Sequence, residues 1–472
     1  MIAATANYLA ADAKTNKVPV FIIMIQDYSR AFSNRATTSG VGVTVVDWLV
    51  AIEDLQVTVN DLDGGTDLAD LVFSVQDGSP SARGAITADF PSFTFEGKQV
   101  QLFAGYDGLA FADFVTLFTG RIDSLESSNS NLEYTFTCPD IRTDLNRAIY
   151  TLADDGGATS SDHLRTLNGH PLDILLAALE TECGLLSSQV DEAKIIQYRD
   201  TIYSGAQMTF HLDSAPVAKD FIENEIMKPL GAYLRSDNLG RVTVEFFFPI
   251  SPATVFDFSP DNLLDIPAAG QADLINEVIV RLDAAIGSTS SSAFATEKVE
   301  QSAVSIAKYG MYGQQTIESK GLRGGLNGLF LARMTAFLIF QRYAFKALCH
   351  GDNGKNSPSD PINALWTAAR LEPGDFVTLR HPDVPDRTNG VIGITDKVYT
   401  VLDRTWQFPI GGSDGTVQLK LLEVSFGQFK QYLIAPNGEP SYASASSDQG
   451  KYMFLSSDTD QYSNGAAGNT LS

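Results

Sequence analysis

Hydrophobic and polar residues alternate in several stretches of the first 138 residues. In the segment LEYTFTC at 132–138 every second residue is apolar, which is the period of a half-buried strand. Comparable alternation, or a run of β-branched and aromatic residues, predicts further strands at 18–26, 41–46, 56–62, 71–76, 99–106 and 115–125. Because hardly any helical spacing occurs among them, residues 15–138 predict an antiparallel sandwich or barrel.

An acidic sequence, DLDGG at 61–65, lies between two of these strands. Its glycines suit a tight turn, so we predict a plain hairpin that joins 56–62 to 71–76. The segment has some likeness to a calcium loop, but it lacks the third acidic position and the distal Glu. No metal is assigned to it.

The chain is organised around residues 115–150. A polar Ser/Asn run at 127–131 separates two strands, and Pro139 predicts the end of the second one because proline cannot donate to the ladder. After it, apolar residues recur at every fourth position, which predicts a short helix at 140–150. This hairpin followed by a helix predicts the end of one β-domain.

Helical spacing returns in the next part of the chain. Apolar residues on one face predict helices at 172–183, beginning at His170-Pro171, and at 216–230. A regular hairpin at 231–248 follows, whose turn at 236–240 supplies Asn and Gly for positive φ angles. This part is predicted to be α+β.

The remaining chain mixes both patterns. A long apolar helix is predicted at 329–348, after a glycine-rich hinge that does not match a phosphate loop, because no Lys-Ser/Thr follows. Strands or extended segments are predicted before and after this helix, at 274–280, 297–308, 314–318, 371–379, 391–402 and 415–426.

We therefore predict four parts. Residues 1–150 form an N-terminal β-domain, 151–270 an α+β domain, and 271–427 a second β-domain that contains the long helix. Residues 428–472 are rich in Ser, Asn, Gly and Tyr, a composition that rarely builds a core.

An apolar island, KYMFL at 451–455, interrupts this C-terminal tail. Disordered segments often bind partners through such islands, so Tyr452, Phe454 and Leu455 are candidate partner-docking residues. A small additional strand is an equally acceptable interpretation of the same island.

The composition excludes some functions. The chain has 472 residues and a formal charge of −24, and such an acidic balance argues against stable nucleic-acid binding, which needs clustered Lys and Arg. Cys138, Cys183 and Cys349 are far apart, which predicts reduced thiols. No transmembrane segment is predicted, because charged residues such as Arg333 and Arg342 interrupt the long apolar helix.

No sequence pattern predicts an active site. The sequence GGSDG at 411–415 matches the GxSxG pattern of hydrolases, but it lies between two predicted strands and not at a strand-to-helix turn. The five histidines, among them His163 and His170, form no metal-binding spacing. We predict no catalytic, cofactor-binding or metal-binding residues, and hence no enzyme.

Several segments resemble the baseplate or tail-tip hub proteins of tailed bacteriophages. In that family a strand of the form G…V.V..GY precedes F.G.I, an alternating strand and a D…L helix. The corresponding segments here are FEGKQVQLFAGY at 95–106, ADFVTLFTGRI at 112–122 and CPDIRTDL at 138–145. Later matches come in the family's order, at 231–249, 274–280, 329–348 and 371–377. The resemblance spans roughly residues 15–427.

This resemblance implies a fold and a role. The fold is mainly β, with two tail-tube-like antiparallel barrel or sandwich domains, smaller α+β domains and one long helix. The role is that of a homotrimeric structural virion protein that is made in the host cytoplasm, closes the tail tube and takes part in genome ejection. Its partners would be tail-tube or distal ring proteins, the tape measure protein, and a spike or central fibre. Some relatives add an iron–sulfur domain held by cysteines, but this chain has no cysteine after Cys349.

Two other classes of function remain open from the sequence. A carbohydrate- or receptor-binding tail module would use the aromatic loops at 106–114 and 406–408 to stack on sugars. A tail-associated peptidoglycan hydrolase would need an acid/base or metal set, and no such set is recognised.

Overall fold

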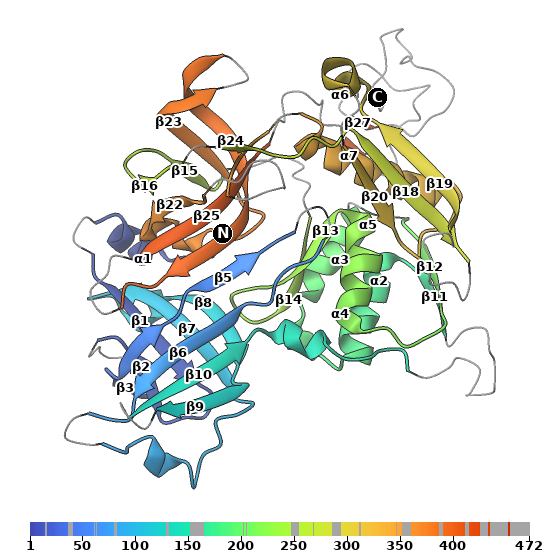
Figure 1. Cartoon of the computed structure of the whole chain (residues 1–472). Coiled ribbons are helices and arrows are strands. Elements are labelled where there is room, and N and C mark those ends of the chain that lie inside the picture. Colours follow the sequence, from blue (N-terminus) through green and yellow to red (C-terminus); the bar gives the residue numbers. More distant parts are fainter. Residues whose placement is uncertain are drawn as a thin grey trace.

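The computed structural model describes residues 1–14, 17–35, 41–60, 62, 64–79, 83–128, 132–151, 165–201, 203, 205–246, 254–267, 269–285, 294–310, 313–345, 347–351, 360–386, 390–410, 415–424, 433–434 and 452–453. Within them the chain is mainly β, with shorter helical parts and one long helix, as the sequence predicted. Figure 1 shows two β-sections stacked on one side of the molecule, and helices with smaller sheets on the other.

The N-terminal β-section comprises the strands between residues 19 and 139 except β5. One sheet has the order β3-β2-β1-β7-β8 and the other the order β4-β6-β10-β9. Phe32 and Phe136 pack across the two sheets with ring centroids 6.4 Å apart, which confirms the predicted sandwich. The strands are β1 (Pro19–Ile25), β2 (Arg30–Ser33), β3 (Thr44–Val46), β4 (Leu49–Ile52), β6 (Asp70–Gln76), β7 (Gln99–Tyr106), β8 (Val115–Arg121), β9 (Ser124–Ser128) and β10 (Glu133–Pro139).

The segment 115–150 differs from the prediction in two ways. The predicted strand 115–125 is two strands, β8 and β9, which belong to different sheets, although β9 and β10 form the predicted hairpin. The predicted helix 140–150 is only a 3₁₀ turn, η3 (Ile141–Leu145). It stops early because Ile149 donates its backbone N–H to Pro216, so the chain pairs with a distant segment instead of continuing the helix.

The middle part is α+β, as predicted. The first predicted helix is α2 (Pro171–Leu176), which continues as the π-helix η4 (Ala177–Glu182). The second is α4 (Ala218–Asp220), the π-helix η6 (Phe221–Met227) and α5 (Lys228–Leu230). The predicted hairpin is formed by β13 (Ala232–Ser236) and β14 (Val242–Phe246). The remaining elements are α3 (Glu192–Thr201), β11 (Arg165–Gly169) and β12 (Met208–Leu212).

A three-stranded sheet and the long helix follow. The sheet has the order β19-β18-β20, from β18 (Glu277–Ala284), β19 (Phe294–Gln301) and β20 (Gln314–Glu318). The end of the predicted strand 297–308 is instead the helix α6 (Ala303–Tyr309). The long helix, α7 (Leu326–Tyr343), begins and ends earlier than predicted. Its predicted last turn is replaced by strand β21 (Leu348–His350), because these residues pair with another sheet.

The C-terminal β-section is built on one large sheet. A path β15-β23-β24-β25-β21-β17 runs through it, and β22 pairs with both β16 and β25. The strands predicted from 371–379, 391–402 and 415–426 are β23, β24 and β25. The bounds are β15 (Phe256–Phe258), β16 (Leu263–Asp265), β17 (Gly270–Gln271), β22 (Ile362–Leu365), β23 (Phe376–Asp386), β24 (Val391–Gln407) and β25 (Thr416–Glu423).

Strand β5 (Leu55–Thr58) corrects the predicted hairpin at 56–76. It does not pair with β6; it pairs antiparallel with β24 of the C-terminal β-section, while β6 lies between β4 and β10. β5 and β6 therefore form no two-stranded hairpin in the described residues, although a single bridge joins Val59 to Thr66.

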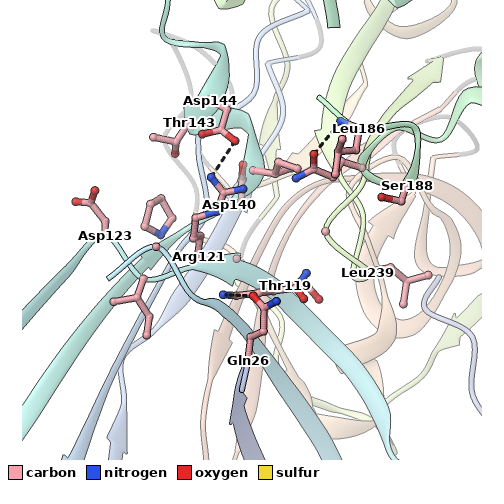
Figure 2. Close-up of a pocket in the computed structure, with 18 residues that line it drawn as sticks. Gln26, Thr119, Arg121, Asp123, Asp140, Thr143, Asp144, Leu186, Ser188 and Leu239 are labelled. Atoms are coloured by element: carbon pink, nitrogen blue, oxygen red, sulfur yellow. Dashed lines mark hydrogen bonds and ion pairs between the residues drawn. The ribbon is translucent and has the colours of Figure 1, made fainter. Parts of the chain in front are cut away.

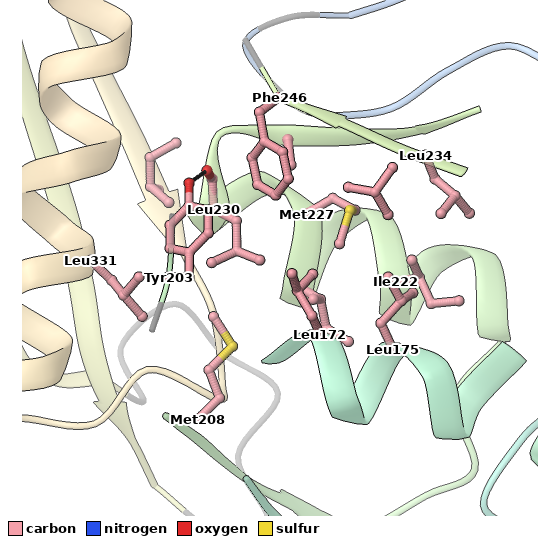
Figure 3. Close-up of a cluster of buried hydrophobic side chains, with 14 of the residues drawn as sticks. Leu172, Leu175, Tyr203, Met208, Ile222, Met227, Leu230, Leu234, Phe246 and Leu331 are labelled. Atoms are coloured by element: carbon pink, nitrogen blue, oxygen red, sulfur yellow. Dashed lines mark hydrogen bonds between the residues drawn. The ribbon is translucent and has the colours of Figure 1, made fainter. Parts of the chain in front are cut away.

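Two hydrophobic cores hold these parts together. One core combines the N-terminal helix α1 (Ala6–Asp12) with both β-sections. The other combines the middle part with the three-stranded sheet and α7, and Figure 3 shows Leu331 of α7 in the same cluster as Tyr203 and Leu230. The domain limits at 150, 270 and 427 stay predictions. Within the described ranges, no helix is both long and apolar enough to cross a membrane.

Candidate functional site

The two β-sections are joined through the strand pair β5–β24. Residues 55–58 lie beside 403–406 in antiparallel register, and Val59 donates its backbone N–H to Leu402 at 2.9 Å. The carboxylate of Asp403 accepts hydrogen bonds from Gln56 Nε2 and Thr58 Oγ1, both at 2.7 Å. β5 therefore extends the sheet of the C-terminal β-section, although in the chain it lies between β4 and β6 of the N-terminal β-section.

The two β-sections repeat one arrangement of strands. In the N-terminal section the row β4-β6-β10-β9 is antiparallel throughout, and so is the row β16-β22-β25-β24 in the C-terminal section. Both sections also contain a glycine with positive φ two residues before a strand, Gly97 before β7 and Gly374 before β23. One chain thus contains two β-units that share a row of four antiparallel strands, although the C-terminal row is part of a larger nine-stranded sheet.

A cluster of buried charges surrounds the second of these glycines. Glu372 Oε1 accepts from Arg235 Nη1 of β13 at 2.7 Å, and Asp375 Oδ1 accepts from the amino group of Met1 at 2.7 Å. The hydroxyl of Tyr233, also on β13, donates to the carbonyl of Pro373 at 2.9 Å. This turn therefore fastens the hairpin of the middle part to the C-terminal β-section.

Electrostatics keep these charges paired. Burial alone would raise the pKa of Glu372, but Arg235 and the amino group of Met1 outweigh burial and hold that pKa below its usual range. Nearby, burial lowers the pKa of Arg404 to about 10. The Arg404 guanidinium lies 3.6 Å from the ring centroid of Trp406, and its Nη1 donates to the carbonyl of Leu371 at 2.6 Å.

Arg142, from the CPDIRTDL segment, fastens the N-terminal β-section to the same hairpin. Its guanidinium forms an ion pair with Asp140, with Nη2 and Oδ2 2.6 Å apart, and both side chains are almost fully buried. It also donates to the hydroxyl of Thr66 and to the carbonyls of Asp67 and Leu234. The segments that carry the family resemblance thus lie at the contacts between parts of the molecule.

A cleft of about 820 Å³ opens beside this contact (Figure 2). Arg121 and Asp123 line one wall, and Leu186 and Leu239 of the middle part line the other. Arg121 Nη1 and Asp144 Oδ2 form an exposed ion pair at 3.3 Å across the cleft floor. The lining includes the hydroxyls of Thr119, Thr143 and Ser188, and no hydrogen bond from any of them to a carboxylate is described.

We expected each histidine to be solvated or to cap a helix, and His350 contradicts this expectation because its side chain is fully buried. His170 is the N-cap of α2, and its Nδ1 accepts from the backbone N–H of Leu172. The residues described contain no group of three His, Cys, Asp or Glu side chains that could hold a metal. None of the three cysteines forms a disulfide, and all three are buried. His163 and Ser413 lie outside the described residues.

The aromatic residues proposed for stacking on sugars are largely in the core. Trp406 is 0% exposed, and Tyr106 and Phe408 are also buried. Phe111 and Phe114 are partly buried and pack against Phe103 and its neighbours on the outer face of β1. Tyr106, Trp406 and Phe408 are therefore not available to stack on sugars, and the carbohydrate-binding hypothesis is wrong for these three residues.

The structure describes little of the candidate docking island. Tyr452 and Met453 form a two-residue strand, β27 (Tyr452–Met453), which pairs in parallel with β26 (Leu433–Ile434). Phe454 and Leu455 lie outside the described residues. Docking through Tyr452, Phe454 and Leu455 stays a prediction.

Sequence reasoning missed the residues of the β5–β24 joint. Alternation identified both strands, but no local pattern indicates that Thr58 pairs with Asp403, 345 residues further along the chain. The only indication in the sequence was that both strands carry polar residues, Gln56 and Asp403. Polar residues are too common in strands to identify a pairing partner.

Comparisons with known proteins agree with the resemblance seen in the sequence. No family model and no curated protein matches the chain. It is similar to the solved 43 kDa tail protein of prophage MuSo2 from Shewanella oneidensis, with 11% identity, a TM-score of 0.45, and coverage of 86% of this chain and 98% of that chain. For the tail protein from Neisseria meningitidis MC58 the values are 12%, 0.42, 86% and 96%.

A third similar structure is the prophage tail protein gp18 from Listeria monocytogenes EGD-e. It has 9% identity, a TM-score of 0.46, and coverage of 85% of this chain and 94% of that chain. All three are tail proteins, the class that the sequence motifs resemble. Because every one of these TM-scores is below 0.5, the argument for function below rests on the geometry of this chain.

Proposed function

We propose that this chain is a structural virion protein at the distal end of a phage tail. In this proposal it forms a homotrimeric hub that closes the tail tube and connects it to a spike or central fibre. Its further partners are the tail-tube or distal ring proteins and the tape measure protein. It acts by shape and assembly, and not by catalysis.

The observation that carries this proposal is that one chain holds two β-sections, each with a row of four antiparallel strands, and that β5 connects them by pairing with β24. Three chains with two such units each present six similar units around one axis. A ring of this kind matches a sixfold tube on one side and a threefold spike on the other. The buried ion pairs of Arg142 and Arg235 fix the units relative to the middle part, as a rigid adaptor requires.

The charge of the chain fits passage of DNA through such a ring. A net charge of −24 repels the DNA backbone, so a lumen lined by acidic residues would not retain the genome during ejection. Replacing lumen acids with lysine is expected to slow ejection at low salt, and unchanged ejection kinetics would argue against this part of the proposal.

A cryo-EM reconstruction of the tail tip of the particle tests the proposal. Three copies of this chain in a pseudo-sixfold ring are the expected result. Six copies, a single copy, or absence of the chain from the particle would each contradict it.

As a control for enzymatic alternatives, the purified protein should not degrade host cell walls. Clearing that disappears in a Ser413→Ala variant would show a hydrolase instead.

A further inference from the structure

The outer edge of strand β9 has no strand beside it in the described part of the chain. β9 pairs with β10 on one side only, and it is the last strand of its sheet. Glu126 and Ser127 are exposed, and Leu125 is half-buried. Exposed edges of this kind present unpaired backbone groups to any extended segment that approaches.

The corresponding edge in the C-terminal β-section is occupied. In the matched rows, β24 pairs with β25 as β9 pairs with β10, and the outer side of β24 is covered by β23 along 391–400 and by β5 along 403–406. Along 403–406 of β24 the C-terminal row is thus extended by β5, whereas the N-terminal row ends at β9 in the part of the chain that the structure describes. The N-terminal unit therefore lacks the one strand that its counterpart receives from elsewhere in the chain.

The pairing of β5 with β24 indicates which part of the protein would lie beside β9. Within the chain, the N-terminal unit gives β5 to the edge of the C-terminal unit. In Figure 1, β5 lies between the two β-sections, and β9 lies on the far side of the N-terminal section. For the same kind of contact to form again, a C-terminal β-section must lie next to β9. The C-terminal β-section of the same chain already pairs with β5, so a second chain must supply it.

We propose that the β9 edge receives a strand from the C-terminal β-section of a second copy of this chain. The contact is head-to-tail, because the donor and the acceptor edges are different surfaces, and head-to-tail contacts close into rings when the rotation allows it. This inference rests on the proposed homo-oligomeric hub, and it identifies one interface through which the ring closes.

The chemistry of the edge suits addition of a strand between copies. Serine and glutamate side chains border β9, so affinity would come from main-chain hydrogen bonds and not from apolar burial. In the joint within the chain, the carboxylate of Asp403 accepts from two polar side chains of β5. Glu126 offers a carboxylate on β9 for the same purpose.

Two consecutive proline substitutions test the proposal in the full-length protein. In a strand the N–H groups of neighbouring residues point to opposite sides, so one of Leu125 and Glu126 donates toward β10 and the other toward the open edge. Leu125→Pro and Glu126→Pro should therefore differ. One should lower the melting temperature, and the other should fold normally but lose assembly.

The assembly state is measured by analytical ultracentrifugation over a range of concentrations. The normally folded proline variant should assemble at least ten-fold more weakly than the wild type, and the matched Glu126→Ala variant should assemble within about two-fold of it. A folded proline variant that assembles like the wild type overturns the inference. So does a wild-type chain that stays monomeric at all concentrations.

Hydrogen exchange provides a second measurement in case both proline variants unfold. Amides at 125–127 that point away from β10 should exchange at least ten-fold more slowly in the assembled wild type than in dilute monomer. Equal exchange in both states overturns the inference. These outcomes are separate from those of the tail-tip reconstruction, which can find the chain in the particle even if another surface closes the ring.

Discussion

Gly374 has a backbone conformation and a close neighbour that together require glycine. Its φ is +92°, and a Cβ at this position would collide with the hydroxyl of Tyr233. The repeated position Gly97 has a similar φ of +78°, but nothing lies within 4 Å of a Cβ added there. The same turn is therefore used twice, and only the second copy is packed against another part of the chain.

Gly374→Ala is expected to destabilise the protein more than Gly97→Ala. The positive φ costs about 1–2 kcal/mol in either variant, and the clash adds about 1–3 kcal/mol in Gly374→Ala alone. Urea unfolding of both variants measures the difference. Tyr233→Phe should recover part of the loss in Gly374→Ala and none in Gly97→Ala. Equal losses in the two glycine variants would contradict the described packing.

His350 makes the stability of the C-terminal β-section depend on pH. Its side chain is fully buried, and burial lowers its pKa from 6.5 to about 4. Because the unfolded chain binds a proton more readily than the folded one, stability is complete above pH 6.5 and is lost as the pH falls toward 4.

The expected loss from His350 is about 3 kcal/mol between pH 6.5 and 4. Denaturant unfolding at several pH values measures it, and a His350→Phe variant provides the comparison. The variant should show a shallower decrease in unfolding free energy over this range, whatever its stability at pH 7. An identical pH dependence in both proteins would assign the decrease to other groups.

At the scale of elements, the contacts between parts of the chain depend on a few buried ion pairs. Arg142→Ala leaves the carboxylate of Asp140 buried without its partner, which costs about 3–5 kcal/mol. Arg121→Ala is the matched control, because the ion pair of Arg121 with Asp144 is exposed and contributes about 0–1 kcal/mol. Thermal unfolding of both variants measures this difference. A small effect of Arg142→Ala would show that packing alone holds the hairpin β13–β14 in place.

The sequence predicts elements whose stabilising contacts are local. The hairpin β13–β14 and strands such as β7 and β23 are where alternation and turn residues place them. The errors occur where distant residues decide the structure. Apolar spacing predicted a helix after Pro139, but pairing of Ile149 with Pro216 prevents it, and α7 ends at Tyr343 because Leu348 belongs to a sheet. The β5–β24 joint was missed because polar residues such as Gln56 and Asp403 are too common in strands to identify a distant partner.

At the scale of the whole molecule, two hydrophobic cores join the β-sections and the middle part, and after residue 427 the structure describes only 433–434 and 452–453. β26 and β27 pair with each other, and no pairing between them and another sheet is described. Folding on a partner would explain why an apolar island persists in a polar tail.

Deletion of residues 430–472 should leave the melting temperature of the isolated protein within about 2 °C of the wild type, because none of the core residues that the structure describes lies in this segment. The same deletion should abolish attachment of the distal tail component, which is measured by electron microscopy of particles. Substitution of Tyr452 alone with Ala is a milder comparison. A large loss of stability would show that the tail belongs to one of the two cores.

Because β5 pairs with β24, the protein cannot finish folding until β24 has been synthesised. A ribosome adds about 5–20 residues per second, so the 345 residues between Thr58 and Asp403 take about 20–70 seconds to synthesise. During this interval β5 has emerged, but its partner strand does not yet exist. The nascent chain must keep an unpaired strand from binding the wrong partner for most of its synthesis, and any second nascent chain on the same messenger presents the same strand nearby.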